Sequence, residues 1–243
     1  MRIPRIYLNQ CLIAGISIEL SVEAHRHVVN VLRLREKDKL ILFNGENREF
    51  LCHLSHVEKK KSVVQIESEL ENNTTSPLNI ELGLSLIKND KFDFAIQKSV
   101  ELGVTSITPL SAERSTIKLD AKREIKRQAH WQGIIQSACE QSGRNRLPTL
   151  NPIATISKWL NQSDIPGIVF EPTATTPLSK IEISDKVRII IGPEGGFTEQ
   201  ELKDISQHAF NKIKIGPRIL RAETAAVTAI TALQLLWGDL NLD

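Results

Sequence analysis

A regular alternation of apolar strands and helices runs through the chain from Asn79 onward, and it limits the possible folds more than any other feature. The pattern predicts strands over 80–86, 107–110, 167–170, 187–191 and 212–215, and helices over 91–102, 121–141, 199–209 and from 222 onward. The strands at 167–170 and 187–191 are almost continuously apolar, as strands buried on both faces are. The sequence therefore predicts a mostly parallel α/β sheet with helices on both faces.

The first 72 residues follow a different pattern. Short strands are predicted over 5–8, 39–43, 50–54 and 62–66, and Asn44-Gly45 signals a hairpin turn after the second of them. One helix is expected over 23–34, and the polar stretch 71–77 is typical of a linker. We therefore expect a small β-barrel over 1–72 and a separate α/β domain over 73–243.

Composition excludes several classes of protein. The chain has 243 residues, 25% of them charged, with a formal net charge of +2, so it is neither disordered nor a wholly basic nucleic-acid-coating domain. Its apolar runs are too short to span a bilayer, and its N-terminus lacks a signal-peptide pattern. Three widely spaced cysteines, Cys11, Cys52 and Cys139, favour a reducing, cytoplasmic location. The motifs of P-loop, dinucleotide-binding, zinc-protease and serine-hydrolase sites are absent, and no histidine spacing indicates a metal site.

A glycine-rich loop is the strongest local signal for a binding site. The strand ending at Ile191 runs directly into Gly192-Pro193-Glu194-Gly195-Gly196, and Thr198 with Glu201 forms a capping box for the helix that follows. Ligands bind at the carboxyl ends of strands in open α/β sheets, where glycine lets the backbone approach them closely. The alternative is a tight strand-to-helix turn with no ligand.

A second loop of the same kind follows the next strand. Ile215-Gly216-Pro217-Arg218-Ile219-Leu220 leads into a helix that is rich in alanine. The alternative is an ordinary alanine-rich helix, because alanine is the best helix former. Two Gly-Pro loops after consecutive strands favour one shared ligand pocket.

Local basic clusters are the candidates for contact with RNA. The segment 138–148 ends a helix at Gly143, and Arg144 and Arg146 are expected to project from it toward phosphate or a base edge. Two further clusters contain Arg26, Arg33 and Arg35 beside His27, and Arg114, Arg123 and Arg127. The alternatives are complementation of the helix dipole by the loop arginines and solvated helix faces for the clusters.

These motifs together resemble one known family. The segments HVVNVLR (27–33), KFDFAIQKSVELGVTSITP (91–109), ACEQSGRNRLP (138–148), IGPEGGFTEQE (191–201) and IGPRILRAETAAVTA (215–229) carry the resemblance. The chain resembles the SPOUT-class RNA methyltransferases with a C-terminal trefoil knot, most closely the RsmE-type uridine-N3 methyltransferases of 16S ribosomal RNA. It departs from the family pattern at Lys37-Asp38, where the family usually has Gly-Asp, and at Ile215, where leucine is usual.

The resemblance implies a cofactor, a substrate and a set of binding residues. The implied cofactor is S-adenosylmethionine, held by the loops of the knot, and the implied N-terminal domain is a PUA-like RNA-binding barrel. The implied cofactor residues are Phe170, Glu171, Pro172, Ile191, Gly192, Pro193, Glu194, Gly195, Gly196, Ile215, Gly216, Pro217, Arg218, Ile219, Leu220 and Ala225. The expected RNA-binding residues are Arg26, His27, Arg33, Arg35, Arg114, Arg123, Arg127 and Arg146. No metal is implied.

Methylation at uridine N3 requires loss of the proton on that nitrogen, from a base that is unpaired or extruded. We expect Arg144 and Arg221 near the uridine, with Glu194 or Glu223 as the base, and the sequence does not choose between the two acids. The family places the pocket at a dimer interface. A homodimer is therefore expected, with Arg144 as a candidate for contribution from the partner, and 16S rRNA in the small ribosomal subunit is the expected substrate.

Other functions remain open at the level of sequence. One is methylation of another ribosomal or transfer RNA site, including a ribose 2′-hydroxyl, and another is a non-catalytic RNA-binding or ribosome-assembly protein. A nucleotide-dependent oxidoreductase is disfavoured, because no glycine-rich turn follows the strand at 80–86.

Overall fold

The computed structural model describes residues 3–115, 117 and 119–241 of the chain. Its contacts divide the chain into two compact units, one of residues 1–75 with 139–147 and the other of residues 76–138 with 148–243. The boundary expected from the sequence, between 72 and 73, lies three residues before the structural one. Packing of the segment 139–147 with the N-terminal residues is not foreseen by the sequence patterns.

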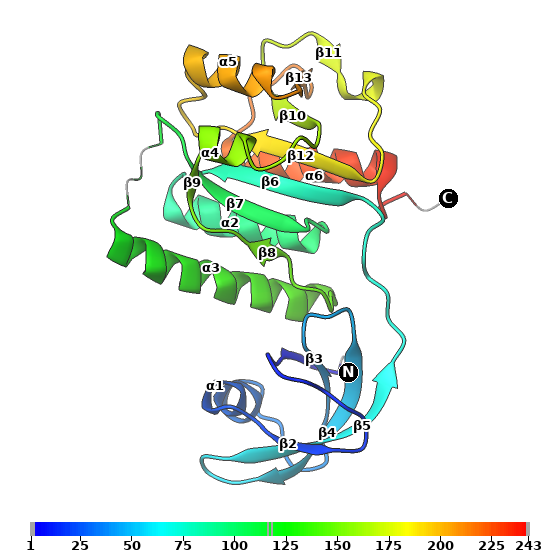
Figure 1. Cartoon of the computed structure of the whole chain (residues 1–243). Coiled ribbons are helices and arrows are strands. Elements are labelled where there is room, and N and C mark those ends of the chain that lie inside the picture. The colour runs from blue at the N-terminus through cyan, green and yellow to red at the C-terminus, as the bar shows by residue number, and fades with distance from the viewer. Residues whose placement is uncertain (1–2, 116, 118, 242–243) are drawn as a thin grey trace. The chain divides into compact units, whose positions relative to one another are not determined.

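The N-terminal unit is built on one five-stranded sheet with the order β1-β3-β4-β5-β2 (Figure 1). Its elements are β1 (Arg5–Tyr7), β2 (Ser17–Glu19), α1 (Val22–His25), η1 (Arg26–Val31), β3 (Lys39–Phe43), β4 (Glu49–Val57) and β5 (Ser62–Leu70). All neighbouring strands are antiparallel except β1 and β3. The four predicted strands are confirmed, and β2 is an addition. The predicted helix is found as a short α-helix that continues as the π-helix η1.

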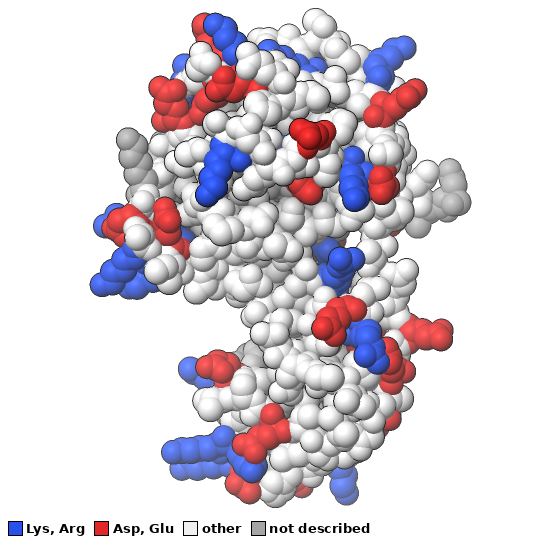
Figure 2. All heavy atoms as spheres, viewed as in Figure 1, with Lys and Arg blue, Asp and Glu red and all other residues white. Residues whose placement is uncertain are grey.

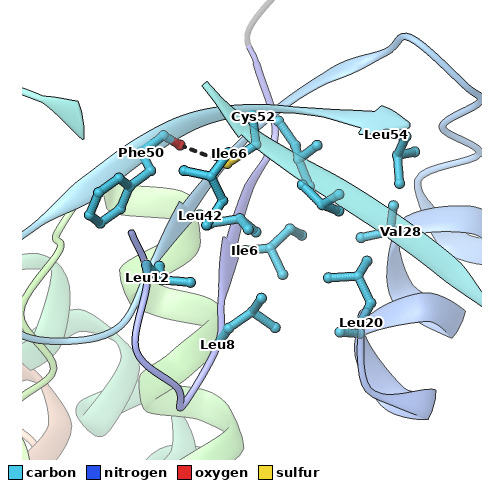
Figure 3. Close-up of a cluster of buried hydrophobic side chains, with 13 residues drawn as sticks. Ile6, Leu8, Leu12, Leu20, Val28, Leu42, Phe50, Cys52, Leu54 and Ile66 are labelled. Atoms are coloured by element: carbon cyan, nitrogen blue, oxygen red, sulfur yellow. Dashed lines mark hydrogen bonds between the residues drawn. The ribbon is translucent and has the colours of Figure 1, made fainter. Parts of the chain in front are cut away.

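Alternating apolar residues of these strands form the core of the N-terminal unit. Figure 3 shows Ile6, Leu42, Phe50, Cys52 and Leu54 converging with Leu8, Leu12, Leu20, Val28 and Ile66. The Cys52 Sγ donates to the Phe50 backbone oxygen at 3.4 Å, and burial raises the pKa of this thiol to about 12. Cys52 is therefore a core residue and is protonated at neutral pH.

Residues 139–147 are bound to the N-terminal unit by hydrogen bonds. The Tyr7 backbone N–H donates to Glu140 Oε1 at 3.0 Å, and the Arg5 Nη2 donates to the Arg144 backbone oxygen at 3.3 Å. The Asn145 side chain, which is fully buried, donates to the Asn72 backbone oxygen at 2.8 Å. Polar side chains at these positions are therefore explained by buried backbone groups that need partners.

The second unit is built on an eight-stranded sheet in which every strand pair is parallel. Its strands are β6 (Asn79–Ser85), β7 (Ser106–Ser111), β8 (Thr149–Leu150), β9 (Ala154–Thr155), β10 (Gly167–Phe170), β11 (Thr176–Pro177), β12 (Lys186–Ile191) and β13 (Phe210–Lys214). Its helices are α2 (Asn89–Glu101), α3 (Ala121–Ser142), α4 (Ile156–Leu160), η2 (Leu178–Lys180), α5 (Glu199–Gln207) and α6 (Ala222–Trp237). The predicted α/β architecture is confirmed.

The strand order of this sheet is β11-β13-β10-β12-β6-β7-β8, with β9 paired to β7 (Figure 1). The strands β10, β12 and β13 lie next to one another, although the first two are separated in sequence by β11 and η2. Because they are parallel, the loops that follow all three strands emerge at one edge of the sheet. The loops after β12 and β13 are the two Gly-Pro loops for which the sequence predicts a shared pocket, and the family resemblance adds the loop after β10.

Helices cover both faces of this sheet. Helix α4 contacts α5, and α2 contacts α6. The core around α4 and α5 includes Val169 and Ile190, whereas the neighbouring Ile189 and Ile191 are buried but lie outside that cluster. Successive side chains of a strand point to opposite faces, so the two helix pairs cover opposite faces.

Charges of both signs are mixed on the face drawn in Figure 2. Figure 2 shows basic and acidic side chains interspersed on both units in that view, as the formal net charge of +2 leads one to expect. No helix within the described residues is long and apolar enough to cross a membrane. In the same residues, no group of three or more His, Cys, Asp or Glu side chains is placed to hold a metal ion.

Candidate functional site

A pocket of about 490 Å³ lies in the second unit, where the loops after β10 and β12 meet the start of α6. Its lining includes cofactor residues that the family resemblance implies, namely Phe170, Glu171, Pro172, Ile191, Gly192, Pro193, Glu194, Gly196, Ile219, Leu220 and Ala225. A smaller cavity of about 70 Å³ adjoins it and is lined by Ile215, Gly216 and Arg218. The two cavities share Phe170, Glu171, Pro172, Leu220 and Ala225. The structure thus brings the two Gly-Pro loops to one place.

Some lining residues are not among those predicted, and two predicted residues line neither cavity. Phe197, Leu202 and Ala222 line the larger pocket, whereas Gly195 and Pro217 lie outside both linings. Phe197 and Leu202 flank the helix start as the residues of a hydrophobic staple. The apolar pair around the capping box is therefore the sequence signal that identifies them.

The glycine-rich loop forms a tight turn before α5. The Gly196 N–H donates to the Pro193 backbone oxygen at 2.8 Å, and Gly196 has a φ of +68°. This left-handed conformation requires glycine or a strained residue. The capping box is confirmed, with the Thr198 side chain and the Glu201 side chain each accepting from the other's backbone N–H.

Two basic side chains from distant parts of the sequence reach this loop. The Lys91 Nζ lies 2.5 Å from Glu194 Oε1, although the residues are 103 positions apart. The Arg114 Nη1 donates to the backbone oxygens of Gly195 at 3.1 Å and Phe197 at 3.4 Å. The hydrogen bond with Lys91 lowers the pKa of Glu194, and the same bond raises the pKa of Lys91. Glu194 is therefore held as a paired carboxylate.

Arg221 and Glu223 lie beside this pair at the start of α6. Arg221 lines the pocket, and both residues act on the pKa of Lys91, which the Glu223 carboxylate raises and the Arg221 guanidinium lowers. The Glu223 Oε2 is buried and has no hydrogen-bond partner among the described residues. The two candidate acids thus differ, because Glu194 lines the pocket and is paired with Lys91, whereas Glu223 has an unpaired oxygen and lies outside the lining of both cavities.

The pocket has the chemistry to hold a nucleoside-like ligand that carries charge. Its volume falls within the range of small-molecule sites, which is about 300–1,000 Å³. Ile191, Leu220 and Ala225 offer apolar walls for a flat ring, and the backbone of the glycine-rich loop offers hydrogen bonds. Glu171 can pair with an ammonium group, and Arg221 supplies a positive charge at the pocket wall. These residues fit S-adenosylmethionine, which has all of these parts.

Arg144 differs from the expectation that it projects from its loop. It is only 9% exposed, whereas Arg146 is exposed as predicted. The burial follows from the packing of residues 139–147 in the N-terminal unit, where the Arg144 backbone oxygen accepts from Arg5. The predicted helix end at Gly143 is confirmed by its φ of +90°.

The predicted RNA-binding residues do not form a single group. Arg26 and His27 belong to η1, and Arg33 and Arg35 follow it in an exposed loop. Arg33 has a φ of +58°, a strained conformation that is concentrated at functional sites. In the second unit, a groove of about 620 Å³ is lined by Asn89, Ile117, Leu119, Arg123, Lys126, Arg127 and His130. Arg114 lies apart from this groove and contacts the glycine-rich loop.

Comparison with known families matches most of the chain. The RNA methyltransferase domain family matches residues 74–234, and the RNA methyltransferase PUA domain family matches residues 21–67. The ribosomal RNA small subunit methyltransferase E of Buchnera aphidicola subsp. Schizaphis graminum is 41% identical over 99% of both chains. The enzyme of the same name from Bacillus subtilis is 31% identical over 92% of this chain and 93% of its own length.

A solved structure agrees with this assignment. The ribosomal RNA small subunit methyltransferase E from Neisseria gonorrhoeae, bound to S-adenosylmethionine, is 39% identical and has a TM-score of 0.93. The similarity covers 99% of this chain and 100% of that one. The fold is therefore that of the SPOUT-type methyltransferases with an N-terminal PUA-like domain. On this evidence the chain belongs to the ribosomal RNA small subunit methyltransferase E family.

Proposed function

We propose that the protein transfers a methyl group from S-adenosylmethionine to N3 of a specific uridine in 16S ribosomal RNA. The observation that carries the proposal is the pocket at the ends of β10 and β12, lined by the residues that the family resemblance assigns to the cofactor. A relative that is 39% identical over the full length binds this same cofactor. The substrate comes from the names of the relatives and from the chemistry of the family.

The cofactor would be held by the three loops around the pocket. Phe170, Leu220 and Ala225 would enclose the adenine, and the backbone of residues 192–196 would supply hydrogen bonds. When bound, S-adenosylmethionine supplies an electrophilic methyl carbon on a positively charged sulfur, and the sulfur keeps the electron pair of the broken sulfur–methyl bond and leaves as a neutral thioether. The protein's own task is to place the uridine edge against that carbon and to exclude water.

The chain must also remove a proton from the uridine. As the N3–H bond breaks, its electron pair becomes available to the methyl carbon, and negative charge spreads to the two flanking carbonyl oxygens. Arg221 at the pocket wall would stabilise that charge, and the buried Arg144 stays a second candidate for the same role. Glu223 would accept the proton on its unpaired oxygen.

Pairing with Lys91 makes Glu194 the poorer candidate for the base. The pair lowers the pKa of Glu194, and a carboxylate with a lower pKa binds a proton more weakly. We therefore expect Glu223→Gln to slow single-turnover methyl transfer about 100-fold or more at saturating cofactor. Glu194→Gln is expected to slow the same step less than about tenfold. Equal, small effects of both substitutions would remove the acid–base part of this proposal.

The RNA would be held by both units. Arg26, His27, Arg33 and Arg35 of the N-terminal unit are exposed or half-buried and can contact phosphates. Arg123 and Arg127 line the groove on α3, and Arg146 is exposed in the loop after α3. Arg114 stays a predicted RNA contact, although its hydrogen bonds to the glycine-rich loop indicate another role.

Salt dependence tests the contribution of the α3 groove. Replacing Arg123 or Arg127 by alanine should weaken RNA binding. It should also reduce the slope of the logarithm of the binding constant against the logarithm of salt concentration, by about 0.7–0.9 for each phosphate that the variant no longer neutralises. Lys158→Ala is the matched control, because Lys158 is exposed on α4 in the same unit and outside this groove. Equal salt slopes for all three variants and the unchanged protein would exclude the groove from the RNA interface.

We also propose that the protein is a homodimer that acts on assembled small ribosomal subunits. Leu235, Leu236 and Leu240 at the end of the second unit are 49%, 50% and 38% exposed, and such side chains favour burial against a second copy. Sedimentation analysis tests this directly. An active protein that sediments only as a monomer would contradict the proposed arrangement.

Product analysis tests the proposed reaction itself. The purified protein is incubated with labelled S-adenosylmethionine and with small subunits that lack the modification, and the RNA is digested to nucleosides. Labelled 3-methyluridine is the expected product. Label on another base or on a ribose would support S-adenosylmethionine as the cofactor but refute uridine N3 as the target. Absence of methyl transfer with retained cofactor binding would refute the small subunit as the substrate.

A further inference from the structure

The glycine-rich loop 192–197 is braced from two sides by side chains outside the loop. Lys91, in the first turn of α2, pairs with Glu194 at 2.5 Å. Arg114, in the loop after β7, donates to the backbone oxygens of Gly195 and Phe197. Neither Lys91 nor Arg114 belongs to the sequence motifs that predict the cofactor site.

Lys91 lies at an electrostatically unfavourable position in α2. The N-terminus of a helix carries a partial positive charge, so a lysine in the first turn is electrostatically unfavourable. Lys91 nevertheless occupies that turn, and its ammonium group points to the carboxylate of the loop 103 residues away. The pairing with Glu194 offsets the unfavourable position and attaches the loop to α2.

The stem of Arg114 lies against the loop as well. A Cβ added at Gly195 would lie 3.4 Å from the Arg114 Cβ and 3.7 Å from its Cδ. A third connection adds to this brace, because the Glu113 N–H donates at 2.8 Å to the same Glu201 side chain that caps α5. Three hydrogen bonds therefore join residues 113 and 114 to the loop and to the helix after it.

A loop with three glycines needs such bracing if it is to bind a ligand. Glycine loses more conformational freedom on ordering than any other residue, and a mobile loop would lose it when the ligand binds. Gly196 adds a left-handed φ, and a Cβ placed there meets nothing within 4 Å, so its own surroundings hold it weakly. One hydrogen bond within the loop, from the Gly196 N–H to the Pro193 backbone oxygen, orders part of it, and contacts from outside the loop add to that order.

We propose that Lys91 and Arg114 are positioning residues that hold the glycine-rich loop in its cofactor-binding conformation before the cofactor arrives. This inference rests on the proposed function, since it assigns S-adenosylmethionine to this pocket. It also gives Arg114 a role other than contact with RNA and gives Glu194 a role other than that of a base. Lys91 lies outside the pocket lining and Arg114 is part of it, but the hydrogen bonds that brace the loop do not require either residue to touch the cofactor.

Calorimetric binding of S-adenosylmethionine is the first test. Lys91→Met should weaken binding about two- to fivefold, as expected for a partly exposed ion pair, and Arg114→Met about three- to tenfold. Lys91→Arg should bind within about twofold of the unchanged protein, because it keeps the charge. The matched controls are Lys98→Met, which breaks a lysine–glutamate pair on the same helix, and Arg48→Met, which breaks an exposed arginine pair in the other unit. Both controls should leave affinity unchanged.

A double-mutant cycle tests whether the pair itself is responsible. Lys91→Met combined with Glu194→Gln should bind no more weakly than the worse single variant. Fully additive losses would show that the two residues act independently and would overturn the role of the pair.

Hydrogen exchange of the ligand-free protein separates positioning from direct contact. Backbone amides of residues 194–198 should exchange faster in Lys91→Met and Arg114→Met than in the unchanged protein or the controls. Weaker cofactor binding with unchanged exchange would mean that the residue contacts the cofactor directly. Unchanged binding with unchanged exchange would mean that the residue does not order the loop. Either result refutes the inference. If the unchanged protein binds no S-adenosylmethionine, the proposed function fails, while the exchange measurement still decides whether the brace exists.

Discussion

Ala225 offers the sharpest test of where the cofactor binds. It lies in the second turn of α6, is half-buried and lines both the larger pocket and the small cavity beside it. Replacing it by leucine places a larger side chain in the space assigned to the cofactor. Leucine and alanine have nearly equal helix propensities, so the helix itself should form as before.

The expected size of the effect follows from overpacking. Forcing extra methylene groups into an occupied site costs about 1–3 kcal/mol, which corresponds to binding that is about five- to 150-fold weaker. In the ligand-free protein the leucine projects into open space, so the free energy of unfolding should change by less than about 1 kcal/mol. Affinity and stability should thus respond differently to the same substitution.

Calorimetry and urea unfolding measure the two quantities separately. Ala232→Leu is the matched control, since Ala232 is half-buried on the same helix and outside both cavity linings. We expect Ala232→Leu to retain the affinity for S-adenosylmethionine. Wild-type affinity in Ala225→Leu would refute the assignment of the cofactor to this pocket.

Three further predictions concern stability. Arg188 is 1% exposed and donates to three backbone carbonyls at and after the end of α4. Arg188→Met should therefore lower the free energy of unfolding by about 3 kcal/mol or more in urea titrations, and a decrease below about 1 kcal/mol would contradict this. A Cβ at Gly167 would overlap the Phe210 ring, so Gly167→Ala should destabilise the protein by about 2 kcal/mol in the same assay, and unchanged stability would show that the ring moves freely. Burial raises the pKa of Glu140, so its ionisation as the pH rises through and above its usual range disfavours the folded state. Glu140→Gln keeps an acceptor for the Tyr7 N–H and should raise stability, relative to the unchanged protein, more at pH 7 than at pH 4; an equal change at both values would exclude this ionisation as the cause.

The long periodic elements and the loops of the site were predictable because local chemistry determines them. The apolar run at Ile189–Ile191 is typical of a strand buried on both faces, and the glycine and proline after it favour the end of that strand. The capping box at Thr198 fixes the start of α5 to the residue. Ala225 and Leu220 follow from the motif around the second loop, which the pocket lining contains.

The contacts between distant segments were not predictable from one sequence. Neither the pairing of Lys91 with Glu194 nor the bonds from Arg114 to the loop leave a local signal, because the partners are 103 and more than 80 positions apart. The packing of residues 139–147 in the N-terminal unit depends on buried backbone groups of β1 and of the segment before β6. Short elements such as α4 and β9, of five and two residues, are formed by tertiary packing and have no periodicity of their own.

Analysis of 16S ribosomal RNA from cells tests the central claim most directly. Cells that lack this protein are complemented with the unchanged chain, with Ala225→Leu or with Glu223→Gln, and nucleosides of the purified RNA are quantified by mass spectrometry. We predict that 3-methyluridine is absent without the protein, returns with the unchanged chain and falls with both variants at equal protein abundance. Undiminished 3-methyluridine in cells that lack the protein would contradict the account.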